Sequence, residues 1–293
     1  MEHPFRFGIV SSSAHSGAAW MARARRAEEL GYATLLVVDR LPTPLAPLTA
    51  LAVAATATTR LRVGSHVFCN DYRHPALLAK EIATLDFLSH GRVELGMGSG
   101  VGEADFRQLG WSFDSAGTRV SRLEEALRII KPLLSGETAQ LAGKYYTVTD
   151  LRGTPRPVQQ PHPPIFLAGS GKRMLTIAAR EADIIAVTVA VKSAGGSAED
   201  VPLEQKIAWV REAAGERFEQ IELAQTAYYL TLSDGPAEVE PWSGWPIAQT
   251  PMSTSQAIEH LLERRRQYGF SYIQIGDNQM ENFAPVVAHL SGK

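Results

Sequence analysis

Eight short apolar segments alternate with helix-like segments along the whole chain, and this alternation constrains the fold more than any other feature. Apolar strands that are separated by helices pair in parallel and are covered on both faces. Eight such units in one unbroken series predict a closed (β/α)8 TIM barrel rather than the alternative, an open doubly wound α/β sheet. The apolar segments span residues 5–10, 34–39, 61–68, 92–100, 164–169, 183–190, 221–232 and 272–276.

The chain is predicted to form a single domain over residues 1–293, because no linker divides it. Two proline-rich stretches, about 136–164 and 233–251, interrupt the alternation, and their prolines exclude a regular helix through either stretch. We expect them to be insertions in loops at the C-terminal face of the barrel. The second joins the seventh strand to the seventh helix and contains Trp242 and Trp245, so it is either a lid over the catalytic face or a plain surface loop.

Composition excludes several classes of partner. A net charge of −2 over 293 residues gives no general affinity for nucleic acid, and no apolar run is long enough to span a bilayer. The N-terminal sequence has no signal-peptide pattern, and Cys69 is the only cysteine, which excludes an internal disulfide and favours a reducing compartment. The histidines show no metal-ligand spacing, so no metal is predicted. We expect a cytoplasmic protein with a small-molecule substrate.

Residues 90–100, "HGRVELGMGSG", place alternating glycines at the end of the fourth predicted strand. They do not form the G-x-G-x-x-G dinucleotide fingerprint, because its third glycine position falls on Val101 or Glu103. Glycine at the end of a barrel strand permits close approach of a ligand to the backbone, or simply a tight turn. The first interpretation makes Gly98, Ser99 and Gly100 candidate cofactor-binding residues.

The stretch 168–175, "AGSGKRML", is a glycine-rich turn between a strand and a helix. Free amides at a helix N-terminus, together with the helix dipole, form an anion site, and Lys172 and Arg173 add positive charge. A turn without a ligand is the alternative interpretation. The residues expected to surround a phosphate are Ala168, Gly169, Ser170, Gly171 and Lys172.

Asp39 and Arg40 end the second predicted strand, which places them at the catalytic face of a barrel. A guanidinium cannot accept a proton at ordinary pH. Arg40 is therefore expected to stabilise negative charge on a ligand, and the alternative is an ion pair between the two residues at the surface.

Much of the chain resembles the luciferase-like monooxygenase superfamily. The resemblance is carried by "RHPALLAKEIATLDFLSHGRVELGMGSG" (73–100) and also by "PFRFGIV", "AEELGYATLLVVDR", "TTRLRVGSHV", "PVQQPHPPIFLAGSG" and "ERRRQYGFSYIQI". Within the superfamily, "NDYRHP", "REAAGERF" and "FAPVVAHL" resemble the actinobacterial branch that uses the deazaflavin coenzyme F420.

The resemblance implies roles for several residues. It implies a non-proline cis peptide at His66–Val67, forming a bulge that supports the cofactor ring, and a phosphate at the 168–172 loop. The family usually has Asp-His where this chain has Asp39 and Arg40, and that pair lies near the ring. Asp39, Arg40 and His66 are thus the catalytic candidates, and Asn70 is expected to face the pocket.

The resemblance further implies a homodimer that transfers hydride between F420 and a small organic substrate. Two alternatives stay open: an FMN-dependent monooxygenase, and a cofactor-binding protein without catalytic activity, which the replacement of histidine by Arg40 suggests.

Overall fold

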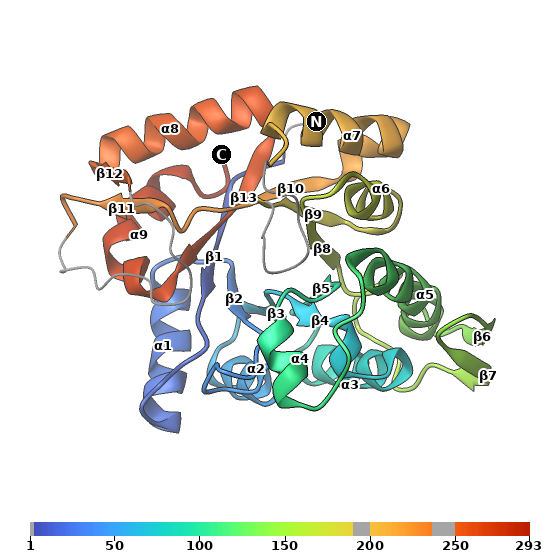
Figure 1. Ribbon diagram of the computed structural model, residues 1–293. Helices are drawn as coiled ribbons and strands as arrows, with labels where there is room; N and C mark the ends of the chain where they lie inside the picture. The colour runs from blue at the N-terminus through green and yellow to red at the C-terminus, as the bar shows by residue number, and fades with distance from the viewer. Residues whose placement is uncertain (1–2, 190–199, 236–249) are drawn as a thin grey trace.

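Eight parallel strands close into a barrel in the computed structural model, which describes residues 3–189, 200–235 and 250–293 (Figure 1). The strands pair in the order β3-β2-β1-β13-β10-β9-β8-β5, and pairing of β3 with β5 closes the ring. The predicted (β/α)8 TIM barrel is confirmed. The barrel strands are β1 (Arg6–Val10), β2 (Thr34–Val37), β3 (Arg62–Ser65), β5 (Val93–Gly98), β8 (Ile165–Gly169), β9 (Ile184–Val187), β10 (Glu222–Thr226) and β13 (Phe270–Gly276).

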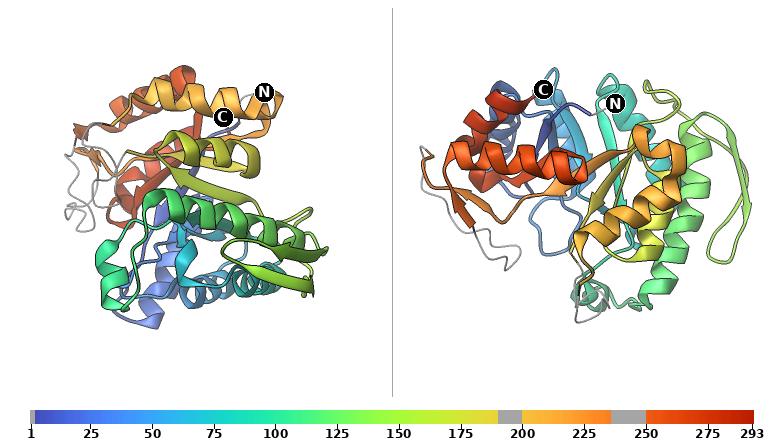
Figure 2. Two further views of the ribbon diagram at one scale, coloured as in Figure 1. Left: turned by 45° about the vertical axis from the view of Figure 1, so that its right-hand side comes forward. Right: turned by 90° about the horizontal axis from the view of Figure 1, so that it is seen from above.

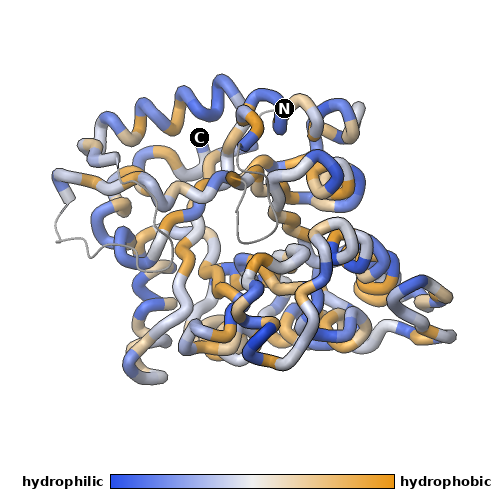
Figure 3. The backbone as a smooth tube through the Cα atoms, in the orientation of Figure 1, coloured by the Kyte–Doolittle hydropathy of each residue, from blue (hydrophilic) through white to orange (hydrophobic). Residues whose placement is uncertain are grey.

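Helices surround the barrel and cover its strands (Figure 2). Local signals set several of their ends: Ser16 caps the first helix, Pro75 occupies the first turn of the third, and Gly269 ends α8 with φ of 85°. In Figure 3, α8 alternates between hydrophilic and hydrophobic stretches, as expected for a helix with one face on the core. The outer helices are α1 (Gly17–Glu29), α2 (Pro47–Ala57), α3 (Pro75–Leu88), α5 (Ala116–Leu134), α6 (Lys172–Glu181), α7 (Leu203–Ala214), α8 (Thr254–Tyr268) and α9 (Met280–Leu290).

Shorter elements interrupt this plan. A two-residue strand β4 (Phe68–Cys69) and the turn η1 (Asn70–Tyr72) follow β3, and the short helix α4 (Glu103–Gln108) follows β5. The predicted strand 221–232 is divided into β10 and β11 (Leu230–Leu232), and β11 pairs with β12 (Thr250–Met252). Two short 3-10 turns, η3 (Gly215–Gln220) and η4 (Asp277–Gln279), complete the described elements. Trp242 and Trp245, whose segment was predicted to be either a lid or a plain surface loop, lie outside the described residues.

The insertion at 136–164 corrects one expectation from the sequence. It forms the antiparallel hairpin β6 (Thr138–Ala142) and β7 (Thr147–Arg152), which extends outward beside α5 (Figure 2). Because the segment runs from helix α5 to strand β8, it lies at the N-terminal end of the strands and not at the C-terminal face. Chain order decides this, since every helix-to-strand connection of a parallel barrel returns to that end.

Charged side chains fill the N-terminal end of the barrel interior. Glu94, which is 1% exposed, binds Arg6 at 2.5 Å and Arg62 at 2.8 Å and also accepts a hydrogen bond from the Tyr272 hydroxyl. Arg6 also binds Glu222 at 2.5 Å. Burial would raise the pKa of Glu94, but the two arginines hold it below its ordinary value. This network closes one end of the barrel and leaves the other end for a ligand.

Apolar and small side chains form the next layer of the interior, including Leu36, Phe166, Ile184 and Ala224. Because side chains alternate along each strand, the residues two positions after this layer also face the barrel interior, nearer its C-terminal end.

No helix among the described residues is long and apolar enough to cross a bilayer.

Candidate active site at the C-terminal end of the barrel

A bulge interrupts the chain directly after β3. The peptide bond between His66 and Val67 is cis, as predicted. The neighbouring strand β5 has glycine where the bulge approaches: a Cβ on Gly96 would lie 2.0 Å from the carbonyl oxygen of Ser65, and one on Gly98 would lie 2.8 Å from a methyl of Val67. Packing against the bulge therefore explains the two glycines, and contact of Gly98 with a cofactor stays a prediction.

His66 belongs to a polar group inside the barrel. Its Nε2 lies 3.0 Å from Oε1 of Gln274 and 3.2 Å from Oγ1 of Thr226, and the Thr226 hydroxyl donates to Gln274 Oε1 at 3.1 Å. The His66 ring also contacts the rings of Phe166 and Tyr228. Burial lowers the pKa of His66 to about 4, so the imidazole is neutral near pH 7. We name His66, Thr226 and Gln274 the polar trio.

Asp39 is buried and fully engaged within the protein. Its carboxylate binds Arg73 through two contacts of 2.5 and 3.0 Å and accepts a hydrogen bond from the Cys69 amide at 3.0 Å. Asp39 therefore anchors the chain that follows the bulge. The Cys69 thiol is buried, which raises its pKa to about 12 and keeps it protonated.

Arg40 pairs with Asp105 of α4 and not with Asp39. Its Nε and one terminal nitrogen lie 2.6 and 3.0 Å from the two carboxylate oxygens of Asp105, and the Tyr72 hydroxyl donates to the same carboxylate at 3.1 Å. The hydrogen bonds from Arg40 are the main reason that the pKa of Asp105 falls below its ordinary value. The guanidinium also lies against Gly102, where a Cβ would come within 2.8 Å of it. Arg40 and Asp105 thus form a clasp between the segment after β2 and α4, and the expectation that Arg40 stabilises negative charge on a ligand stays a prediction.

Asn70 and Ser99 are held by neighbouring side chains. Asn70 is buried, and its amide nitrogen binds Asp71 at 3.0 Å and the Tyr146 hydroxyl at 3.1 Å. Arg119, which is 2% exposed, donates from Nε to the carbonyl of Ser99 at 3.2 Å. The 99–100 loop is thus braced from α5, an interaction that sequence reasoning missed. Gly100 adopts a φ of 84°, which explains its glycine.

The glycine loop before α6 matches the predicted anion site. No side chain caps the helix, so the first-turn N–H groups, which a helix cannot satisfy internally, are available to a ligand. A Cβ on Gly171 would meet nothing within 4 Å, so a ligand can approach the backbone there without obstruction. Lys172 is exposed, with Nζ 5.8 Å from the Trp209 ring centre. Arg173 turns away and binds Glu124 of α5 at 3.3 Å.

Five of the arginines that bridge elements at this face are paired with carboxylates. The pairs are Arg23 with Asp277, Arg40 with Asp105, Arg73 with Asp39, Arg122 with Asp71 and Asp114, and Arg173 with Glu124. Two described cations at this face, Lys172 and Arg107, have no carboxylate partner and are exposed.

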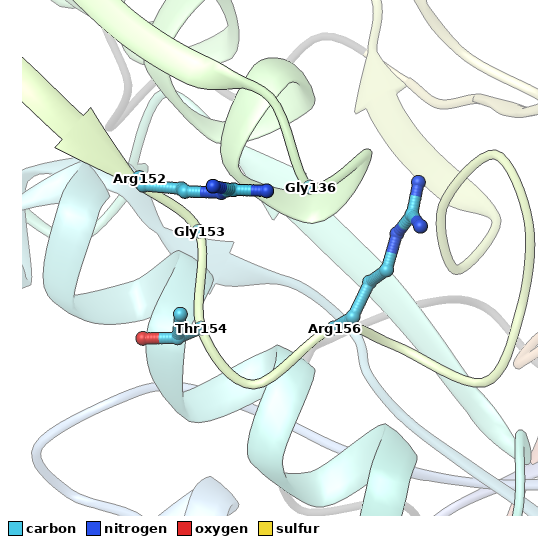
Figure 4. Close-up of a pocket in the computed structure, with 5 residues that line it drawn as sticks. All are labelled: Gly136, Arg152, Gly153, Thr154 and Arg156. Carbon is cyan, nitrogen blue, oxygen red and sulfur yellow. The ribbon is translucent and has the colours of Figure 1, made fainter.

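A separate cavity of about 390 Å³ lies at the base of the β6–β7 hairpin, between Arg152 and Arg156 (Figure 4). Its other lining residues are Gly136, Gly153 and Thr154. The hairpin belongs to the N-terminal end of the barrel, so this cavity is not part of the candidate active site.

A model of the luciferase-like monooxygenase family matches residues 3–285. The chain belongs to this family. It is 33% identical over 192 residues to the F420-dependent glucose-6-phosphate dehydrogenase of Microbacterium testaceum, an alignment that covers 62% of this chain and 56% of that protein. It is also 33% identical over 171 residues to the F420-dependent hydroxymycolic acid dehydrogenase of Mycobacterium tuberculosis, covering 56% and 47%.

The FMNH2-dependent dimethylsulfone monooxygenase of Pseudomonas putida is 32% identical over 127 residues, covering 43% of this chain and 35% of that protein. The chain spans about half the length of the first two curated relatives. The fold is similar to that of the coenzyme F420-dependent tetrahydromethanopterin reductase of Methanopyrus kandleri, with a TM-score of 0.80, 18% identity and coverage of 99% and 100%.

Proposed function

We propose that this family member is an oxidoreductase that binds F420 at the C-terminal end of the barrel and transfers hydride between it and a small organic substrate. The observation that carries the proposal is the uncapped N-terminus of α6, with an open approach at Gly171. Relatives that are named as F420-dependent enzymes support the choice of cofactor.

The residues fit a phosphate-bearing cofactor. The first-turn amides of α6 would hold the phosphate, with Gly169, Ser170 and Gly171 leaving the backbone accessible and Lys172 adding a charge. F420, when bound, supplies a ring carbon that donates or accepts a hydride and does not activate oxygen. The chain orients the ligands and excludes water. The clasp between Arg40 and Asp105 contributes by holding α4 at the barrel mouth.

Asp39 and Arg40 have positioning roles in this proposal. Asp39 fixes the chain after the bulge through Arg73 and Cys69, and Arg40 fixes α4. The replacement of the usual histidine by Arg40 thus has a structural use in this proposal.

Charge distinguishes F420 from FMN. F420 carries a phosphodiester and a glutamate tail, whereas FMN carries one phosphate monoester, so only F420 has use for a cation beyond the phosphate. Lys172, exposed at the first turn of α6, is our candidate for the tail. Fluorescence titration of the purified protein with each cofactor tests the proposal, and we expect tighter binding of F420. Submicromolar binding of FMN without measurable binding of F420 would support the monooxygenase alternative instead.

We also propose that the protein is a cytoplasmic homodimer. Leu77, Phe87 and Leu88 of α3 are 62%, 55% and 64% exposed, and a group of large exposed apolar side chains favours an interface. Light scattering coupled to size-exclusion chromatography tests this. A monomer at micromolar concentration would contradict it.

A further inference from the structure

Gln274 has an unused hydrogen-bond donor inside the barrel. The side chain is 0% exposed, its Oε1 is engaged by His66 and Thr226, and its Nε2 has no hydrogen-bond partner. A buried amide N–H without a partner costs about 1–3 kcal/mol. Such a donor in a native site calls for an acceptor that the protein itself does not supply.

The position of Gln274 places this donor below the barrel mouth. Tyr272 faces the interior, because its hydroxyl reaches Glu94, and Gln274 lies two residues further along β13 on the same face. The strand ends at Gly276, beside Val10 of β1. Gln274 is therefore the last side chain of β13 that projects into the barrel before the mouth.

The surroundings of Gln274 carry no net charge. His66 is neutral near pH 7, and Thr226 is uncharged. The partly buried side chains against this layer are Val38, Val67, Ala168 and Tyr228. An anion in such a place would lose its hydration without gaining a counter-ion, which costs several kcal/mol.

The arginines that bridge elements around the mouth are already bound to other groups of the protein. The bridging arginines described above bind carboxylates, and the buried Arg119 binds backbone carbonyls. Among the described residues at this face, Lys172 stands at the phosphate loop and Arg107 is exposed on α4. In the sequence of the segments outside the description, Lys192 is the only lysine or arginine.

We propose that the substrate is an uncharged compound whose carbonyl or hydroxyl oxygen accepts a hydrogen bond from Nε2 of Gln274, and that phosphorylated and carboxylated compounds are excluded. This inference rests on the proposed oxidoreductase function and specifies its substrate class. It separates this chain from a relative named for a sugar phosphate. Thr226 and His66 act as positioning residues, because they hold the Gln274 amide in one orientation.

Acetone and acetate test the inference, because they have nearly the same shape and differ in charge. The protein is labelled with 15N at glutamine side chains and saturated with F420, and the Gln274 signals are assigned by their loss in Gln274→Met. We expect acetone to shift these signals, and acetate and inorganic phosphate to leave them unchanged. Equal shifts with acetate or phosphate, or no shift with acetone, would overturn the proposal.

The Gln274→Met variant provides a second measurement. It should raise the Kd for acetone about 3- to 10-fold, the loss expected for one hydrogen bond between uncharged groups, and change the Kd for F420 less than twofold. Gln225→Met is the matched control, because Gln225 lies next to Thr226 but binds Tyr229 and Arg264 on the helix side of the sheet. The control should alter neither Kd.

The outcomes separate the inference from the proposed function. If F420 binds normally to the wild-type protein but loses affinity in Gln274→Met, the donor belongs to the cofactor and the substrate inference fails. If F420 does not bind at all, the proposed function fails, and the acetone titration of the protein alone still tests the contact with Gln274.

Discussion

The clasp between Arg40 and Asp105 makes a quantitative prediction about α4. Asp105 is 0% exposed and accepts four hydrogen bonds, two from Arg40, one from the amide of Leu41 and one from Tyr72. Asp105→Ala removes all four acceptor contacts and leaves the guanidinium without its partner. The perturbation thus acts on a buried ion pair and not on a surface contact.

The expected cost follows from burial. Removal of one partner from a buried ion pair costs about 3–5 kcal/mol. Arg40 keeps 28% of its side chain exposed, so water can solvate part of the released charge. We therefore expect Asp105→Ala to lower the free energy of unfolding by about 3 kcal/mol, the lower end of that range. Arg40→Ala alone should cost at least as much, because it leaves the buried Asp105 carboxylate with hydrogen bonds from Tyr72 and Leu41 but without a counter-ion.

A double-mutant cycle measures the pair itself. Urea unfolding of the wild type, Arg40→Ala, Asp105→Ala and the double variant should give a coupling energy of about 1–2 kcal/mol. Hydrogen exchange should show faster opening of 103–108 in each single variant. Arg107→Ala is the control, since this exposed arginine of α4 has no carboxylate partner among the described residues. Additivity within about 0.5 kcal/mol would refute the clasp.

Further predictions concern titration, packing and cofactor binding. The pKa of His66 should be about 4 by NMR, and a value above 6 would contradict the buried, neutral imidazole. Because this pKa is below the ordinary 6.5, protonation of His66 should lower the free energy of unfolding increasingly as the pH falls from 6.5 towards 4. Gly96→Ala should lower the free energy of unfolding by more than about 2 kcal/mol, because the new Cβ would meet the backbone oxygen of Ser65. Gly17→Ala is the control and should not destabilise the protein, because a Cβ there would lie in open space. Equal stability of the two variants would refute the packing argument. Lys172→Ala should weaken F420 binding by up to about 1 kcal/mol at low salt and by less at high salt. Fluorescence titrations measure both values. The same loss at both salt concentrations would contradict an exposed ion pair between Lys172 and the cofactor.

The strands and most helices could be predicted from the sequence because their signals are local. Apolar runs mark the strands, and Pro75 and Gly269 mark helix ends within a few residues. Helix α4 was not predicted, because its six residues have neither a side-chain cap nor an extended apolar period. Its position depends on Asp105, whose partner Arg40 is 65 residues away.

The candidate site was predicted less completely, because its contacts join distant strands. The sequence placed Asp39, Arg40 and His66 correctly at strand ends, but Gln274 lies 208 residues from His66. One signal was available: in "FSYIQIG", Gln274 is polar and shares the face of Tyr272 in a strand that is buried throughout. A polar residue at an inward position near the end of a barrel strand is a candidate for ligand contact, and alternation along the strand is sufficient to identify Gln274 as such a candidate.

The most direct test of the proposed F420 site is a crystal structure of the protein with F420. We expect the cofactor phosphate to bind the first-turn amides of α6, at Lys172, Arg173 and Met174, within ordinary hydrogen-bond distance of about 2.7–3.2 Å. We also expect the ring to lie at the barrel mouth, on the side of the polar trio. A phosphate bound elsewhere, with the N-terminus of α6 facing only solvent, would contradict the proposed cofactor site.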